Sequence, residues 1–158
     1  MHRITSIGAP ILGELHDSNQ QVWVLQGQNL ISVPRRHGVT PAIIALAPCK
    51  HPETLEINRG NPIYLGLKKP ELCLFCTLIS GQPTLQYKEQ NVLNLYNQSE
   101  PVKPFLFYHN QNGRMSTFES VAFPGWFIAG CSEGGCPLII TQELGKAHIT
   151  DFGITVLN

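Results

Sequence analysis

The residues of this chain best suited to chemistry are its five cysteines, Cys49, Cys73, Cys76, Cys131 and Cys136. Cys73 and Cys76 have the Cys-x-x-Cys spacing of a zinc or redox motif. They lie in a segment, 71–78, that alternates like a β-strand, and positions three apart on a strand point to opposite faces. Because their sulfurs then diverge, we predict that both are buried structural cysteines and bind no metal.

Cys131 and Cys136 flank the sequence Ser-Glu-Gly-Gly, which is typical of a hairpin tip. The odd number of cysteines and an N-terminus without a secretory signal favour free thiols. The position of these two cysteines on either side of one tip leaves a bridge between them open.

The six histidines are scattered and show no local pairing with an acid or thiol of the kind that a catalytic site uses, and we interpret them as solvated side chains. The chain contains no phosphate-binding loop, dinucleotide glycine pattern, His-Glu-x-x-His or Gly-x-Ser-x-Gly motif. With no nucleophile, acid and base together, we expect no enzyme, no catalytic or metal-binding residues and no cofactor.

A single Gln-x-Trp sequence, Gln21-Val22-Trp23, matches the signature of ricin-type trefoil lectins. A lectin repeats this signature, whereas it occurs once here. We therefore interpret Trp23 as an edge tryptophan of a strand.

The composition describes one globular domain. The chain has 158 residues, of which 42% are hydrophobic and 14% charged, and its formal net charge is zero. Such a chain can bury a core, and its neutral balance argues against nucleic acid or an anionic membrane as partner. No segment has the length of a transmembrane helix, so membrane insertion is not expected.

Short apolar segments separated by turn signals predict an all-β sandwich or barrel of about twelve strands. These segments are 14–17, 21–25, 30–33, 42–47, 63–67, 71–78, 84–87, 105–108, 115–121, 126–129, 138–141 and 149–157. The segment 91–96 predicts one or two helical turns capped by Asn91. We interpret 1–13 as a loose tail and 50–61 as a long polar loop.

The segment 118–129 reads as strand, Pro-Gly corner, strand. We interpret it as a packing device. It also resembles the signature of the interleukin-1 family, whose places are filled by Phe118, Ser120, Val121, Pro124, Phe127, Ile128 and Ala129. Gly130 stands where that signature prefers threonine.

Further segments resemble the interleukin-36 subgroup of that family. They include Asn-Pro-Ile-Tyr-Leu-Gly at 61–66, Glu-Pro-Val-Lys at 100–103, and the segments 131–138 and 141–146. The resemblance implies a β-trefoil, with a six-stranded barrel and a hairpin cap, formed by a single domain over 6–158.

The resemblance also implies a function. The protein would be a monomeric pro-inflammatory cytokine, cytoplasmic until secreted by a route without a signal peptide. It would bind the interleukin-36 receptor, recruit the interleukin-1 receptor accessory protein, and activate NF-κB and MAP kinase signalling in epithelial and immune cells.

Members of this subgroup gain full activity when the N-terminus is cut roughly nine residues before an apolar-x-Asp motif. Here the motif is Leu15-His16-Asp17, so the resemblance implies a propeptide of 1–5 and a mature chain that begins at Ser6.

The receptor-facing segments implied by the resemblance are 50–61 and 145–151, with the tip at 110–114 as a weaker candidate. Within them we expect receptor contacts from Arg59, Asn61, Lys146 and His148. The alternatives are an antagonist of the same receptor, a trefoil carbohydrate-binding protein, and a trefoil protease inhibitor with a reactive loop in 50–61.

Overall fold

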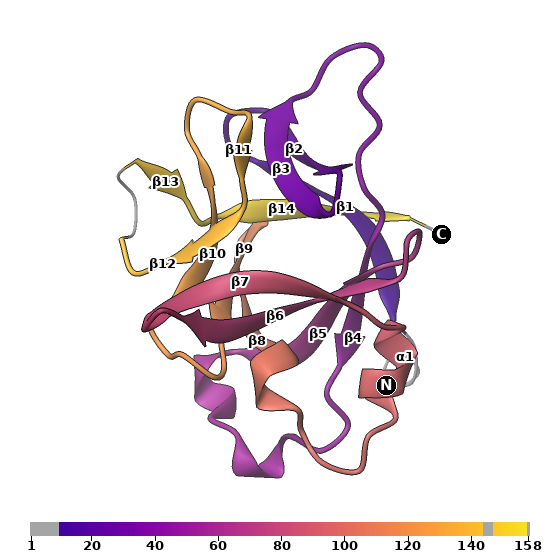
Figure 1. The fold of residues 1–158 in the computed structure, drawn as a ribbon, viewed down its shortest axis with the longest axis vertical. Coiled ribbons are helices and arrows are strands. Elements are labelled where there is room, and N and C mark those ends of the chain that lie inside the picture. The colour runs from indigo at the N-terminus through magenta and orange to yellow at the C-terminus, as the bar shows by residue number, and fades with distance from the viewer. Residues whose placement is uncertain (1–9, 144–146, 158) are drawn as a thin grey trace.

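The computed structural model describes residues 10–143 and 147–157, and these residues are almost entirely β-structure (Figure 1). The strands are β1 (Ile11–Asp17), β2 (Gln21–Gln26), β3 (Asn29–Pro34), β4 (Ile44–Pro48), β5 (Asn61–Leu67), β6 (Leu72–Ile79), β7 (Gln82–Glu89), β8 (Leu106–Asn112), β9 (Met115–Ser120), β10 (Phe127–Cys131), β11 (Cys136–Pro137), β12 (Ile139–Thr141), β13 (His148–Ile149) and β14 (Phe152–Leu157). Short helical segments are η2 (Pro52–Thr54), η3 (Ile57–Arg59), α1 (Val92–Tyr96) and η4 (Lys103–Phe105).

Six of the strands pair in a closed ring. The order β1–β4–β5–β8–β9–β14 returns to β1, and every pair in it is antiparallel. Three hairpin units, β2–β3, β6–β7 and β10–β12, extend from the ring. A ring of six strands with three hairpins confirms the predicted all-β trefoil.

The chain differs from the predicted boundaries mainly at its two ends. The prediction of a loose tail as far as residue 13 was wrong, because Ile11 to Gly13 pair with β4 and Leu12 to Asp17 pair with β14. The predicted last strand is two strands, β13 and β14, which join different partners. The short β11, which pairs with β3, was not predicted.

The main core lies inside the ring and under the hairpins. Trp23 has no exposed surface and makes edge-to-face contacts with Phe152 and Phe118, at 5.0 Å and 6.4 Å between ring centroids. The interpretation of Trp23 as an edge residue was wrong, since β2 lies between β1 and β3 in the sheet. A buried indole cannot stack on a sugar, and this removes the one feature that suggested a lectin.

The cysteines divide into three free thiols and one disulfide. Cys76 packs in the main core and Cys73 in a second cluster beside α1, which confirms that their side chains diverge. Burial raises the pKa of each to about 12. Cys49, Cys73 and Cys76 are free, as expected. The expectation of free thiols was wrong for Cys131 and Cys136, which form a disulfide across the tip 132–135.

Candidate functional site

The 50–61 loop is the first predicted receptor-facing segment, and an ion pair ties it to the core. Arg59, at the end of η3, places Nη1 3.0 Å from Oε2 of Glu119 on β9. The Glu119 side chain is only 7% exposed, whereas that of Arg59 is 40% exposed. The backbone N–H of Gly125 donates to the same Glu119 oxygen at 2.7 Å. This carboxylate therefore joins the loop, β9 and the Pro-Gly corner.

The same loop is held at other points. Gly60 has a φ of +142°, and a Cβ there would lie 2.9 Å from the carbonyl oxygen of His109, so the position favours glycine. The Glu56 N–H donates to the Tyr108 hydroxyl at 3.1 Å. At its start, Lys50 donates to the Asn97 side chain and lies over the Tyr96 ring. The predicted polar loop is thus a fixed platform containing two helical turns, η2 and η3, below the ring in Figure 1.

Asn61 begins β5 directly after this platform and is exposed. It lines a groove of about 670 Å³ at one end of the ring, where all six ring strands contribute residues. The groove is lined by Ile11, Leu46, Pro48, Cys49, Pro52, Asn61, Pro62, Ile63, His109, Gln111, Arg114, Ser116, Ile154 and Val156. These described lining residues are mostly apolar and include one arginine and no acid. Gln111 and Arg114 bring the weaker candidate tip, 110–114, to the same groove as Asn61.

His109 contradicts the interpretation of the histidines as solvated side chains. Its ring stacks on Phe118 with centroids 5.1 Å apart, and Nε2 lies 2.7 Å from the hydroxyl oxygen of the buried Ser116. Burial lowers the pKa of His109. The strand register could have indicated this, because His109 lies opposite Phe118 in the β8–β9 hairpin.

The described part of the second predicted segment, 147–151, lies on another side of the molecule (Figure 1). His148 begins β13 and pairs with Cys131 of β10. Its Nδ1 is buried, has no hydrogen-bond partner among the described residues, and lies 3.9 Å from a carboxylate oxygen of Glu143. Figure 1 shows β13 at the left edge, apart from η2 and η3. Lys146 lies outside the described residues.

The structure thus brings Arg59 and Asn61 together and leaves His148 separate. Sequence reasoning missed Glu119, the partner of Arg59. The available signal was a carboxylate inside an otherwise buried strand segment, but its partner is 60 residues away in the sequence. The contact could not be inferred from local pattern.

The proposed processing motif is part of the folded core. Leu15 has no exposed surface and Asp17 is 2% exposed. The Asp17 carboxylate accepts from the backbone N–H groups of Asn19 and Gln21 and from the Gln21 side chain, at 2.8, 3.0 and 2.8 Å. The motif therefore closes the β1–β2 turn. Ser6 and the predicted propeptide, 1–5, lie outside the described residues.

Comparisons with known proteins agree with these features. The family model described as interleukin-1 / 18 matches residues 51–154. Human interleukin-36 alpha is 62% identical over 157 residues, covering 99% of both chains, and mouse interleukin-36 alpha is 52% identical over 95% of this chain and 94% of its own. The NMR structure of the pro-inflammatory cytokine interleukin-36alpha superimposes with a TM-score of 0.83, at 62% identity and full coverage of both chains. Within the described residues, no helix is both long and apolar enough to cross a membrane.

Proposed function

Because this chain belongs to the interleukin-1 / interleukin-18 family of cytokines, we propose that it is an agonist that binds the interleukin-36 receptor and recruits the interleukin-1 receptor accessory protein. The observation that carries the proposal is the similarity to human interleukin-36 alpha along almost the whole chain. The protein is a receptor-binding cytokine and acts outside the cell. Signalling through the paired receptors then activates NF-κB and MAP kinases in epithelial and immune cells.

Two surfaces are proposed to contact receptor. One is the 50–61 loop with Arg59 and Asn61, which the core holds in a fixed conformation. The other is the segment 145–151 with Lys146 and His148. A preorganised loop supports this role because binding to a rigid surface loses less conformational entropy than binding to a loop that must first be ordered.

A reporter assay tests the proposal. Cells that express both receptor subunits and an NF-κB reporter should respond to the protein, and cells that lack either subunit should not. If the protein gives no signal but blocks the response to an interleukin-36 agonist, it is an antagonist and the proposal is wrong. If the response persists without the interleukin-36 receptor, the proposed partner is wrong.

We also propose that removal of 1–5 raises potency, so that the mature chain begins at Ser6. The cytokine would leave the cytoplasm by a route without a signal peptide and be cut afterwards. Leu15 and Asp17 support a structural meaning for the motif. Both are buried residues that anchor β1, the first strand, and the cut lies at a set distance before them. The protease would then not need to read the motif, because both side chains are buried in the folded chain.

The two forms, 1–158 and 6–158, separate this proposal from the first. The 6–158 form should reach half-maximal reporter response at a much lower concentration than the full chain. Equal potency contradicts the processing step and leaves the receptor assignment standing. A control truncation that begins at Leu12 removes Ile11, which pairs with Leu46 of β4, and should lose stability as well.

A further inference from the structure

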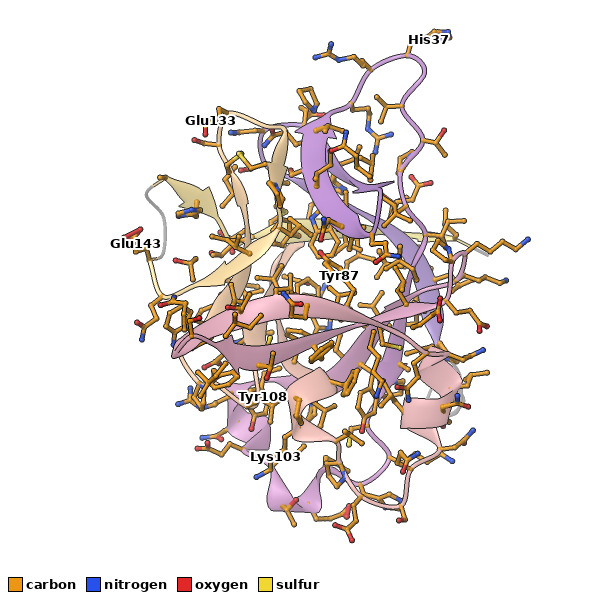
Figure 2. All side chains as sticks on the ribbon, viewed as in Figure 1. His37, Tyr87, Lys103, Tyr108, Glu133 and Glu143 are labelled. Carbon is orange, nitrogen blue, oxygen red and sulfur yellow. A yellow bond between two sulfur atoms is a disulfide. The ribbon has the colours of Figure 1, made fainter. Side chains whose placement is uncertain are left out.

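We propose that the tip between β10 and β11 is a site for a soft or borderline divalent cation such as zinc when its disulfide is reduced, with Cys131, Cys136 and Glu133 as ligands. One ligand atom from each lies within 4.8 Å of the other two. Glu133 is exposed at the outer end of the tip, where Figure 2 labels it. Among the described residues this is the one group of His, Cys, Asp or Glu side chains with such a spacing.

The backbone brings the two cysteines together without relying on the sulfur–sulfur bond. Gly134 and Gly135 both have a φ of +84°, which returns the chain on itself within four residues. A Cβ on Gly134 would collide with the side-chain oxygen of Gln21, so the first of these glycines also allows a close approach.

Hydrogen bonds hold the tip to neighbouring strands. The Gly135 N–H donates to the Ser32 carbonyl at 2.6 Å. The Gln21 side chain donates to the Cys131 carbonyl at 3.1 Å, and Asn19 donates to the Ser132 carbonyl at 3.4 Å. These bonds do not involve sulfur, so reduction of the disulfide breaks none of them directly. The two thiols then stay within reach of one ion.

The distances suit zinc. Two thiolates bound to a tetrahedral zinc at about 2.3 Å each lie about 3.8 Å apart. This separation is accessible to side chains whose Cα atoms are 5.9 Å apart. The Glu133 carboxylate is the third ligand, at 3.8 Å from the Cys136 sulfur, and water takes the fourth position.

Reduction of the disulfide and binding of the cation each conserve atoms and charge. A dithiol or phosphine reductant supplies two electrons, and with two protons the disulfide becomes two thiols. Binding of the cation then displaces both thiol protons, and the metal keeps its oxidation state. Oxidation and metal binding compete for the same sulfurs, so the bridged form has no site.

The other cysteines provide an internal contrast. Cys73 and Cys76 point into separate core clusters, and burial raises the pKa of each to about 12, so their thiolates are disfavoured. Cys49 is half-buried and belongs to no such cluster of the described residues. Cys49→Ser is therefore a matched control that removes a thiol without touching the tip.

The test is a titration of the full chain with Cd²⁺, a spectroscopic substitute for zinc, before and after reduction by a phosphine. The reduced chain should show thiolate-to-cadmium absorption that saturates at one equivalent and is displaced by Zn²⁺. The oxidised chain should show none. Cys136→Ser should abolish the signal, Cys49→Ser should leave it unchanged, and Glu133→Gln should weaken binding by roughly tenfold or more, as for loss of a supporting ligand.

A thermal melt of each reduced variant shows whether it is folded. Glu133→Gln lies on the exposed tip and keeps the fold, so it remains informative if Cys136→Ser does not fold. The proposal is overturned if the folded, reduced chain gives no saturable absorption. It is also overturned if oxidised and reduced chains bind alike, or if the signal survives Cys136→Ser or is lost in Cys49→Ser.

Discussion

The two segments with the expected receptor contacts are attached to the molecule in different ways. The 50–61 loop is tied to the core by the Arg59–Glu119 ion pair, by the Tyr108 hydroxyl and by the close approach of Gly60 to β8. The segment with His148 joins the fold through two paired positions between β13 and β10. The 50–61 loop is therefore held to the core at several points, whereas the segment with His148 is attached through a short strand pair.

This difference determines how mutations must be interpreted. A substitution at Arg59 is expected to disturb folding as well as the proposed receptor contact, because the same guanidinium neutralises the buried Glu119 carboxylate. A substitution at His148 removes no ion pair with a buried partner, since Glu143 is exposed. Loss of binding is therefore direct evidence of receptor contact at His148 and indirect evidence at Arg59.

The largest effect on stability is expected in the main core, at Phe118. Phe118 has no exposed surface and packs against Trp23, Phe152 and His109. Phe118→Ala should lower the free energy of unfolding by about 3–5 kcal/mol, since it removes a buried ring and leaves a cavity. Urea unfolding measures this. A loss below about 1 kcal/mol would mean that the corner does not support the core as described.

Arg59→Ala should come next. It leaves the Glu119 carboxylate buried with the Gly125 N–H as its remaining partner among the described residues, and should cost about 2–3 kcal/mol. Glu119→Gln should cost less, because the amide oxygen still accepts from Gly125. If the ion pair carries the effect, the double variant loses less than the sum of the two single variants in urea unfolding.

Strict additivity in that cycle would show that Arg59 and Glu119 do not stabilise the fold as a pair. Arg59 would then be no more part of the structural framework than His148. Receptor binding of each variant should be measured at a temperature where it is fully folded. A loss of receptor binding that persists at that temperature is caused by the loss of a receptor contact and not by unfolding.

A smaller effect is expected from pH. Burial lowers the pKa of His109 from its ordinary value of 6.5. Below that value the unfolded chain takes up a proton that the folded chain resists, so stability falls as pH falls toward the folded pKa. His109→Gln removes this titration. Unfolding in urea at about pH 7.5 and about pH 5.5 should show a shallower pH dependence in the variant than in the parent.

The other histidines are common to both proteins in that experiment, so their contribution cancels in the difference. An identical pH dependence in parent and variant would show that His109 is not desolvated at the β8–β9 hairpin.

The smallest effect on stability is expected at the second segment. His148→Ala should change the free energy of unfolding by less than about 1 kcal/mol, because the residue is only partly buried and its Nδ1 has no hydrogen-bond partner among the described residues. Receptor binding should nevertheless weaken, as measured with the immobilised receptor ectodomain. Unchanged binding would remove this segment from the proposed receptor surface.

The sequence predicted the strands well because alternation and turn residues are local properties. Within the described residues, the helical turns at α1 and the Asn91 cap were also correct, with the Asn91 side chain accepting from the Leu93 N–H. The beginning of β1 was missed because Ile11 and Leu12 are held by pairing with distant strands, not by their own pattern.

The features missed within the candidate site share the same cause. Glu119, the environment of His109 and the burial of Asp17 depend on partners that folding brings together. The bridge between Cys131 and Cys136 was left open for a different reason. The hairpin tip suggested that the two cysteines are close, whereas the odd number of cysteines favoured free thiols. The number of cysteines was therefore a poorer guide to this disulfide than the short turn between the two residues.

We propose that this cytokine binds the interleukin-36 receptor and then recruits the accessory protein to complete a signalling pair. The most direct test is sequential binding of the 6–158 form to immobilised receptor ectodomain, followed by addition of the accessory protein ectodomain. We predict that the cytokine binds the first and that the accessory protein then adds to the complex only when cytokine is present. Failure to bind the first subunit, or binding without recruitment of the second, would contradict the proposed receptor assignment.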